Sequence, residues 1–351
     1  MIKIVLIGCG NSGSKRCREF FGSDANSDAC IAGFCDLNIE RAEKIAAEFG
    51  GKAYSDYRLM FEELSPDAAV VCTPPYCTDD ILLYAADAGV SFLTEVPVSS
   101  SCEKGSLVAE KVREKGITAA VHSELYYSRL MQVMRCFVND NQIIYAEAKK
   151  ITPPPAEFWK RDAELCGGIL LEKGIDILTA ADTLFGKIKS VNAISSCGYV
   201  VGIADYCTED SFNAMITYSS NVTLCLSLGS YGTADSGAAF TLYSYGKRLE
   251  LAGDEIRVYG DTFDPSKTKK MLHSGEVIPD EIDADCLIYR NSADKVSVMA
   301  FTDALMTENT PNQLISNRKI PSQQVSSIIS YDEGLRELEI AREIKKRTVK
   351  L

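Results

Sequence analysis

The sequence predicts an α/β protein with two domains: an N-terminal doubly wound parallel sheet and a C-terminal α+β domain with a largely antiparallel, open-faced sheet. The length of 351 residues suits about two domains. Up to residue 122, short β-branched runs alternate with longer stretches of helical period, as in βαβ units. Beyond it, segments of alternating hydrophobicity predominate. We therefore expect domains at residues 1–122 and 123–351.

The first domain is predicted from five short apolar runs. Several of them are apolar on both faces, as strands of a parallel sheet covered by helices are. Between them lie segments whose apolar residues recur with helical spacing. The predicted strands span residues 2–7, 30–35, 68–72, 91–94 and 117–121, and the predicted crossover helices span residues 38–49 and 79–88.

The second domain is predicted from strand pairs separated by turn residues. Its start is read as a helix near 126–138 and a strand near 143–151, followed by a loop that opens with three prolines. The later strands form a meander of five or six, with one face open. The predicted pairs are 212–218 with 222–228 and 240–245 with 248–251; a strand at 256–259 follows, and a helix at 332–347 closes the chain.

Composition and charge exclude several classes of protein. The net charge of −12 disfavours nucleic acid and anionic membrane surfaces as partners. No apolar run is long enough to span a membrane, and the chain opens into a strand without a cleavable leader, so we expect a cytoplasmic protein. The thirteen cysteines are scattered, with no Cys-x-x-Cys, and there are only two histidines. We therefore expect reduced thiols and no metal site.

The strongest local motif is the stretch Gly8-Cys9-Gly10-Asn11-Ser12-Gly13, which directly follows the first strand and opens a helix. In this setting Gly8 makes the tight turn, Gly10 lets backbone N–H groups approach a diphosphate, and Gly13 lets helix and strand pack closely. We therefore expect a Rossmann dinucleotide-binding loop, with Asn11 and Ser12 beside the phosphates. The alternative is an ordinary glycine-rich turn.

Asp36 ends the second strand, 23 residues after Gly13. A carboxylate at this place accepts hydrogen bonds from the adenosine ribose and repels a 2′-phosphate, which favours NAD over NADP. The alternative is a surface aspartate.

Two other strand ends carry polar residues next to prolines. Ligands of open α/β sheets bind beyond the carboxyl ends of the strands. Thr73 and Pro74 follow one strand, and Glu95 and Pro97 follow the next. We expect these four residues to line the site for ribose and nicotinamide, with plain strand termination as the alternative.

Together these residues resemble the glucose-fructose oxidoreductase, inositol dehydrogenase and rhizopine-catabolism (Gfo/Idh/MocA) family of NAD(P)-dependent dehydrogenases. The similarity covers nearly the whole chain. It implies a Rossmann domain, a second domain whose sheet mediates homo-oligomerisation, and oxidation or reduction of sugars and polyols. It rests on the phosphate loop, Asp36 with Glu40-Arg41-Ala42, residues 67–75, Glu95 with Pro97, residues 167–174, and residues 334–339. The resemblance adds Arg41 to the cofactor-binding residues.

The catalytic positions depart from the family pattern. The family's strand-end motif reads Glu-Lys-Pro, but the lysine position here holds Val96. The later motif supplies an aspartate and, four residues on, a histidine, but here these positions hold Glu172 and Asp176. These two carboxylates are predicted to share one helix face and to raise one another's pKa, so that one acts as a base. Lys173 is a weaker candidate, and the alternative is a solvated helix face.

Candidate substrate residues lie near the second domain's start and before the predicted helix at 172–176. Trp159 and Arg161 suit contact with a sugar ring and its hydroxyls. Tyr126 and the adjacent Tyr127 offer phenols, and His122 ends the last strand of the first domain. Structural roles are the alternatives, and for His122 the structural role is favoured.

Three functions follow from these residues. The first is an NAD-dependent oxidoreductase with an atypical proton-transfer set, acting on a sugar-like or other small hydroxylated compound. The second is a non-catalytic protein that binds NAD or a metabolite and regulates or partners through its sheet, as the loss of a lysine at Val96 suggests. The third is a hydrolase or lyase that retains NAD and oxidises its substrate only transiently.

Overall fold

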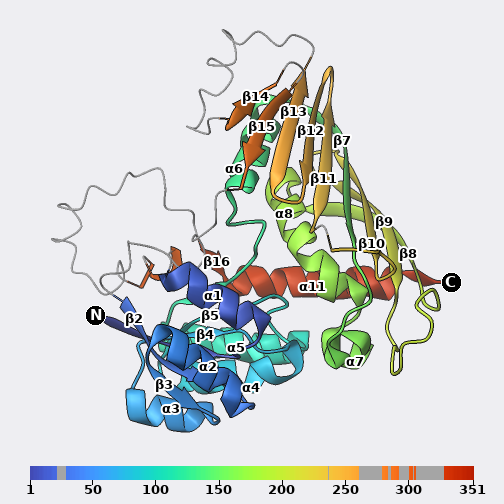
Figure 1. Ribbon diagram of the computed structural model, residues 1–351. Helices are drawn as coiled ribbons and strands as arrows, with labels where there is room; N and C mark the ends of the chain where they lie inside the picture. Colours follow the sequence, from blue (N-terminus) through green and yellow to red (C-terminus); the bar gives the residue numbers. More distant parts are fainter. Residues whose placement is uncertain are drawn as a thin grey trace. The chain divides into compact units, whose positions relative to one another are not determined.

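The computed structural model describes residues 1–21, 29–235, 237–260, 279–283, 286–291, 300–302, 304–305 and 328–351. The chain forms two compact units (Figure 1): unit 1 has residues 1–123 and 294–338, and unit 2 has residues 124–293 and 339–351. The sequence predicted the first boundary at 122, but it placed residues 294–338 in the second domain. Helix α11 (Tyr331–Arg347) begins in unit 1 and ends in unit 2. The predicted α/β architecture is confirmed.

Unit 1 is built on a seven-stranded sheet in the order β16-β6-β5-β4-β1-β2-β3. Every pair is parallel except β16 with β6. Because β1 pairs with β2 on one edge and β4 on the other, the connections leave it in opposite directions. The strands are β1 (Ile2–Ile7), β2 (Ala29–Cys35), β3 (Lys52–Tyr54), β4 (Ala68–Val71), β5 (Ser91–Thr94), β6 (Ala119–Val121) and β16 (Ile329–Ser330).

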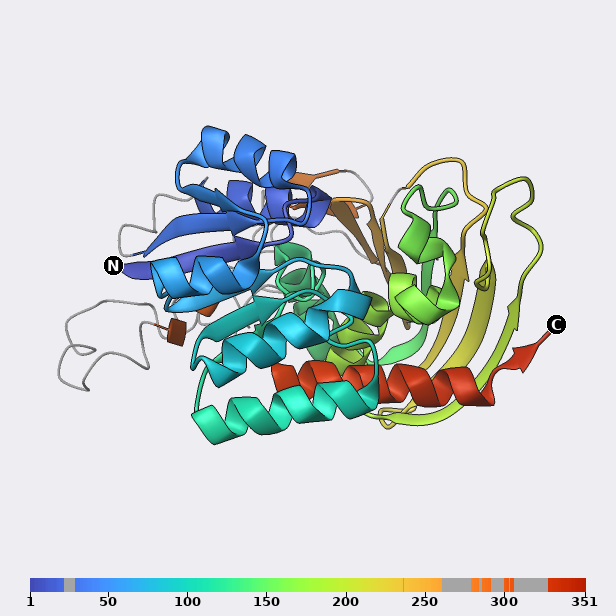
Figure 2. The same ribbon diagram turned by 90° about the horizontal axis from the view of Figure 1, so that it is seen from below.

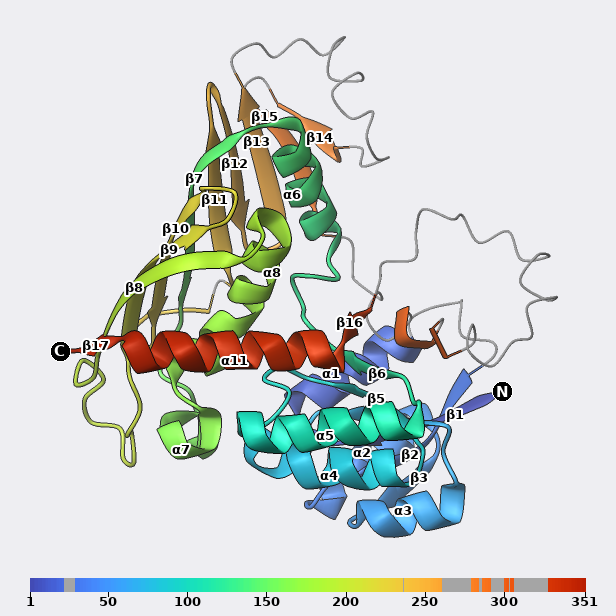
Figure 3. The same ribbon diagram turned by 180° about the vertical axis from the view of Figure 1, so that it is seen from behind.

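Helices cover both faces of this sheet (Figures 2 and 3). Apolar residues of α1 and α2 share one core cluster with β1 and β2, whereas a Cβ on Gly33 of β2 would meet Leu64 of α3 on the other face. The side chains of Phe61 and Tyr84 join α3 to α4, and α4 lies beside α5. The helices are α1 (Asn11–Phe21), α2 (Ile39–Phe49), α3 (Tyr57–Leu64), α4 (Pro75–Asp87) and α5 (Cys102–Lys115).

Unit 2 is built on a ten-stranded sheet in the order β14-β15-β13-β12-β11-β7-β10-β9-β8-β17. The predicted hairpin is β9 with β10, and β11, β12 and β13 form the predicted antiparallel pairs. The sequence did not indicate that β7 pairs in parallel with β10. The strands are β7 (Ile143–Ile151), β8 (Ile188–Ser196), β9 (Ser211–Tyr218), β10 (Thr223–Gly229), β11 (Ala239–Ser244), β12 (Lys247–Ala252), β13 (Glu255–Gly260), β14 (Glu281–Ile282), β15 (Cys286–Arg290) and β17 (Val349–Lys350).

One face of this sheet packs against helices α6 (Arg129–Asp140) and α8 (Ile175–Phe185), as Figure 1 shows. Residues that alternate with the buried ones and so face the other way, such as Glu147, Met215 and Arg248, are exposed or half-buried, which agrees with the predicted open face. Three short helical turns lie between β7 and α8: η1 (Phe158–Arg161), α7 (Ala163–Cys166) and the π-turn η2 (Leu170–Gly174). Within the described part of the chain, no helix has the length and apolar character needed to cross a membrane.

The contact between Gly13 and Gly8 predicts a large loss of stability for Gly13→Ala. A Cβ on Gly13 would lie 1.9 Å from the carbonyl oxygen of Gly8, so the loop and α1 must separate. We expect a loss of about 3 kcal/mol in the free energy of unfolding, measured by urea titration. A Cβ on Gly10 meets nothing within 4 Å, so Gly10→Ala is the matched control. Equal stability of the two variants would contradict this packing.

Candidate functional site

The loop between β1 and α1 is shaped by backbone crowding at two of its three glycines. Gly8 has φ +92, and a Cβ there would lie 2.6 Å from the carbonyl oxygen of Cys72. Gly13 is crowded by Gly8 itself, whereas Gly10 faces open space. The first turn of α1, which starts at Asn11, has no acidic residue. The loop therefore combines an open backbone surface with a helix N-terminus that attracts an anion.

Asp36 lies beside this loop, directly after β2. One carboxylate oxygen accepts the Cys9 N–H at 2.8 Å, and the other accepts the Asn38 N–H at 2.9 Å. Each oxygen can accept a further hydrogen bond, as a ribose diol requires. Burial, and then the charge of Asp36, raise the pKa of the Cys9 thiol to about 12. The charge of Arg41, which is exposed in α2, opposes this rise, so Arg41 lies near the loop. Asp36 is thus fixed by backbone donors at the position predicted for ribose recognition.

A buried arginine that sequence reasoning missed holds Glu95 at the end of β5. Arg16 of α1 is only 5% exposed, and its Nε donates to Glu95 Oε1 at 2.9 Å. Its guanidinium also pairs with Glu19. Burial works against the charged form, but Glu95 and Glu19 outweigh it and raise the pKa of Arg16 above its usual value. The only sequence signal was its place one helical turn after Gly13.

The other predicted strand-end residues surround the same edge of the sheet. Thr73 follows β4, and its hydroxyl lies 2.8 Å from that of Thr78. Pro74 caps α4, and Pro97 follows a cis peptide bond after Val96. His122 follows β6, with its Nε2 4.0 Å from Glu95. Burial, and then the charges of Arg16 and Lys15, hold the pKa of His122 well below its usual value, so its imidazole is neutral near pH 7.

A separate cavity of about 590 Å³ lies within unit 2, a volume typical of small-molecule sites. It brings together residues from the start of α6, from β7, from the π-turn and α8, and from the turns at the ends of β11, β12 and β15. Only Lys173 and Asp176 of the predicted site residues line it. Its polar and charged lining consists of Glu124, Ser128, Lys150, Lys173, Asp176, Asp235, Asp254 and Asn291.

Lys173 is the buried cation of this cavity. It is 5% exposed, and its Nζ donates to Thr152 Oγ1 at 2.6 Å. The Thr152 hydroxyl in turn donates to the carbonyl oxygen of Pro153 at 2.9 Å. Glu172 pairs with Lys173 at 3.2 Å and with Lys160 at 3.5 Å. The ammonium group of Lys173 is therefore held in one position at the cavity wall.

Glu172 and Asp176, the predicted carboxylate pair, lie where a π-turn meets a helix. Residues 170–174 form the π-turn, in which hydrogen bonds span five residues, and α8 begins at Ile175. The two carboxylates make different contacts. The structure brings Lys173 and Asp176 together in the cavity lining, while Glu172 contacts the two lysines.

The other predicted substrate residues lie outside the cavity lining. Arg161 donates from Nε and Nη2 to the carbonyl oxygens of Pro155 and Ala156, so it closes its own loop. Lys160 Nζ lies 5.3 Å from the ring centroid of Trp159. Tyr126 precedes α6 and packs edge-to-face against Tyr127, with Arg135 4.7 Å from its ring centroid. These contacts favour structural roles for the three residues.

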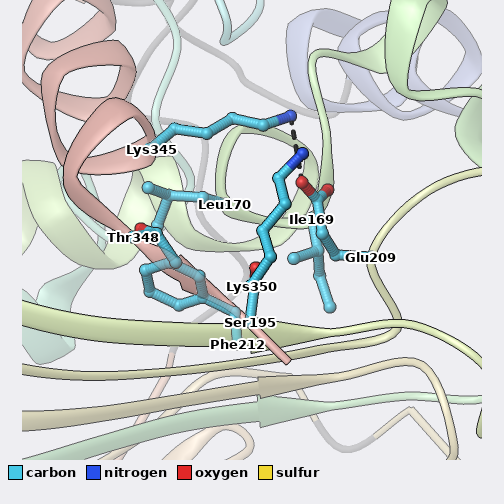
Figure 4. A pocket seen from close by; sticks show the side chains of 8 residues that line it. All are labelled: Ile169, Leu170, Ser195, Glu209, Phe212, Lys345, Thr348 and Lys350. Atoms are coloured by element: carbon cyan, nitrogen blue, oxygen red, sulfur yellow. Dashed lines mark ion pairs between the residues drawn. The ribbon is translucent and has the colours of Figure 1, made fainter.

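Lys345 of α11 supports the turn that precedes the π-turn. Its Nζ donates to the carbonyl oxygen of Gly167 at 2.9 Å and pairs with Glu209 at 3.3 Å (Figure 4). Burial raises the pKa of Glu209, but Lys345 and hydrogen bonds outweigh it, so the net pKa lies below its usual value. The closing helix thereby holds the backbone that leads to Lys173.

The Glu209–Lys345 pair predicts a pH-dependent contribution to stability. Because the pKa of Glu209 is lowered on folding, its contribution is fully present above the ordinary value of 4.5 and is lost as pH falls through the folded-state value. We expect Glu209→Gln to cost about 1 kcal/mol at pH 7 and to have a smaller effect as the pH falls below 4.5 towards 3. Urea unfolding of both proteins at the two pH values measures this, and an effect that grows on acidification would contradict it.

Residues 2–123 match the family model of the oxidoreductases with an NAD-binding Rossmann fold (GFO_IDH_MocA). The match covers the N-terminal part of the chain, which is similar to the Rossmann domain of this family. The match supports a dinucleotide-binding role for unit 1, in agreement with the prediction made from the glycine-rich loop and Asp36. In the described residues, no group of three or more histidine, cysteine or acidic side chains is arranged to hold a metal ion.

Known proteins similar to this chain include dehydrogenases and reductases. The scyllo-inositol 2-dehydrogenase (NAD(+)) of Bacillus subtilis is 24% identical over 80% of both chains. KijD10, a 3-ketoreductase from Actinomadura kijaniata in complex with NADP and TDP-benzene, is 17% identical with a TM-score of 0.77, and the match covers 100% of this chain and 98% of that one. GenD2 from gentamicin A biosynthesis, in complex with NAD, is 13% identical with a TM-score of 0.74, covering 99% and 93%. The two structural matches confirm the fold.

Proposed function

We propose that the protein is an NAD-dependent oxidoreductase that acts on a sugar-like or other small hydroxylated compound. The observation that carries this proposal is the cavity of unit 2, where Lys173 and Asp176 lie together in a chain that also contains a dinucleotide-binding loop. The similarity to an inositol dehydrogenase supports a polyol or sugar substrate. In this proposal unit 1 binds NAD, and unit 2 provides the substrate cavity and the proton-transfer groups.

The residues fit NAD at three places. The open surface at Gly10 and the N-terminus of α1 take the diphosphate, with Asn11 and Ser12 in the first helical turn. Asp36 takes the adenosine ribose and repels a 2′-phosphate, which is why we propose NAD rather than NADP. Thr73, Pro74, Glu95 and Pro97 line the neighbouring strand ends.

Two residues of the cavity supply the proton transfer that Val96, which stands at the family's lysine position, cannot. Oxidation of an alcohol removes a hydride from carbon and a proton from the hydroxyl group. NAD, when bound, supplies the hydride acceptor. We assign proton acceptance to the carboxylate of Asp176, while the ammonium group of Lys173 stabilises the developing charge on the substrate oxygen. Glu172 and Thr152 hold that ammonium group in place.

The proposal further includes association of identical chains through the open sheet face of unit 2. The register places Tyr145, Tyr243, Arg248 and Tyr259 in one row across four strands of that face. Aromatic residues and arginine are enriched in protein interfaces. The proposal also places the protein in a reducing compartment such as the cytoplasm, because its cysteines are scattered along the chain without a Cys-x-x-Cys pair.

Cofactor preference is predicted to depend on Asp36. In calorimetric titrations we expect Asp36→Ala to weaken NAD about 10- to 100-fold, because two hydrogen bonds to a charged acceptor are lost, and to relieve the exclusion of NADP. Asp36→Asn retains an acceptor for the backbone N–H groups and tests whether folding is intact. Gly10→Ala is the control that should weaken both dinucleotides. Tighter binding of NADP than NAD by the unaltered protein would overturn the assignment of Asp36.

Turnover is predicted to depend on the two cavity residues. With a panel of polyols and sugars, formation of reduced nicotinamide should fall at least about 100-fold in Lys173→Met and in Asp176→Asn, with NAD affinity unchanged. Lys189→Met, an exposed lysine of β8, is the control.

A panel that yields no reduced nicotinamide although NAD binds would favour the second candidate, a non-catalytic binding protein. The observation behind that candidate is Val96, which stands where the family has a lysine.

A further inference from the structure

The charge of the cavity lining differs between its exposed and its buried parts. Among its charged residues, Glu124, Asp235 and Asp254 are exposed, whereas Asp176 is half-buried and Lys173 is buried. Four carboxylates stand against two lysines, Lys150 and Lys173, so the lining has a formal charge of −2. A ligand entering from solvent therefore meets acidic side chains first.

The lining is poorly suited to a phosphate group. Phosphates in proteins are held by the forked donors of arginine, by several lysines or by free helix N–H groups. Among the described residues that line the cavity there is no arginine. Lys173 already contacts Glu172 and Thr152, so its ammonium group is engaged within the protein. At the start of α6, the Met131 N–H donates to Ser128 Oγ at 3.1 Å, so this N–H group is already used within the protein.

The same lining suits an uncharged ring that carries hydroxyl groups. Carboxylates and the amide of Asn291 accept and donate the hydrogen bonds that vicinal hydroxyls offer. Apolar side chains of Leu125, Leu130, Ile177 and Leu251 provide surface for the C–H faces of a ring.

We propose that this cavity selects a ring polyol or sugar without phosphate or nucleotide groups, and that Asp235 and Asp254 at its entrance enforce this selection. The inference rests on the proposed function, because it takes the cavity of unit 2 as the substrate site. Like charges facing each other across a site disfavour the wrong partner, which is how carboxylates would exclude phosphorylated sugars.

Binding without turnover tests the proposal. Calorimetry on the full chain with NAD present would compare scyllo-inositol and methyl glucoside with glucose 6-phosphate and UDP-glucose. We expect the two anionic ligands to bind at least about tenfold more weakly than the better neutral one, a difference of about 1.4 kcal/mol that shrinks at high salt. The double variant Asp235→Lys/Asp254→Lys should remove or reverse this difference. Glu110→Lys, on an exposed position of α5, is the matched control with the same change in charge type.

Three results would overturn the selection: equal or tighter binding of the phosphorylated ligands, no response to the double variant, or no binding of either neutral ring. If the double variant unfolds, Asp235→Asn and Asp254→Asn carry the same test with a smaller expected shift. Failure of the proposed function can be distinguished from failure of this selection. In that case the neutral rings would bind selectively but would give no reduced nicotinamide with NAD.

Discussion

The pairing of β1 on both of its edges is the constraint on which unit 1 depends. With β2 on one side and β4 on the other, the loops after these strands diverge and leave backbone groups accessible beyond their carboxyl ends. Close packing at Gly8 and Gly13 keeps the turn after β1 tight. Asp36 then ties this turn to the start of α2 through the N–H groups of Cys9 and Asn38. The diphosphate site and the ribose site that we propose would thus be fixed by the same few residues.

Local sequence patterns were sufficient for those parts of the fold that depend on local chemistry. The runs at Ile2–Ile7 and Ser91–Thr94 are strands with the predicted bounds, and the alternation after residue 211 forms the β9–β10 hairpin. The parallel pairing of β7 with β10 could not be read from the sequence, since it joins segments about seventy residues apart. Residues such as Asp235 and Asp254 reach the cavity only through sheet register, so no motif marked them.

The candidate site was predicted unevenly for a related reason. Glycine spacing identifies a phosphate loop because the backbone itself makes the site, so the residues that matter are consecutive. Proton-transfer groups are side chains contributed by distant segments, and their positions follow from packing. Arg16 illustrates this, because an arginine in an amphipathic helix is normally solvated, yet here Glu95 and Glu19 hold it in the interior. Thr152 is another residue whose contact with Lys173 emerges only in three dimensions.

The π-turn at Leu170–Gly174 bears on how this segment is compared with related proteins. By sequence position, Glu172 and Asp176 stand where the family pattern has a pair spaced by four residues, yet Lys173 and Asp176 are the two that line the cavity. A comparison of letters alone would therefore overlook Lys173.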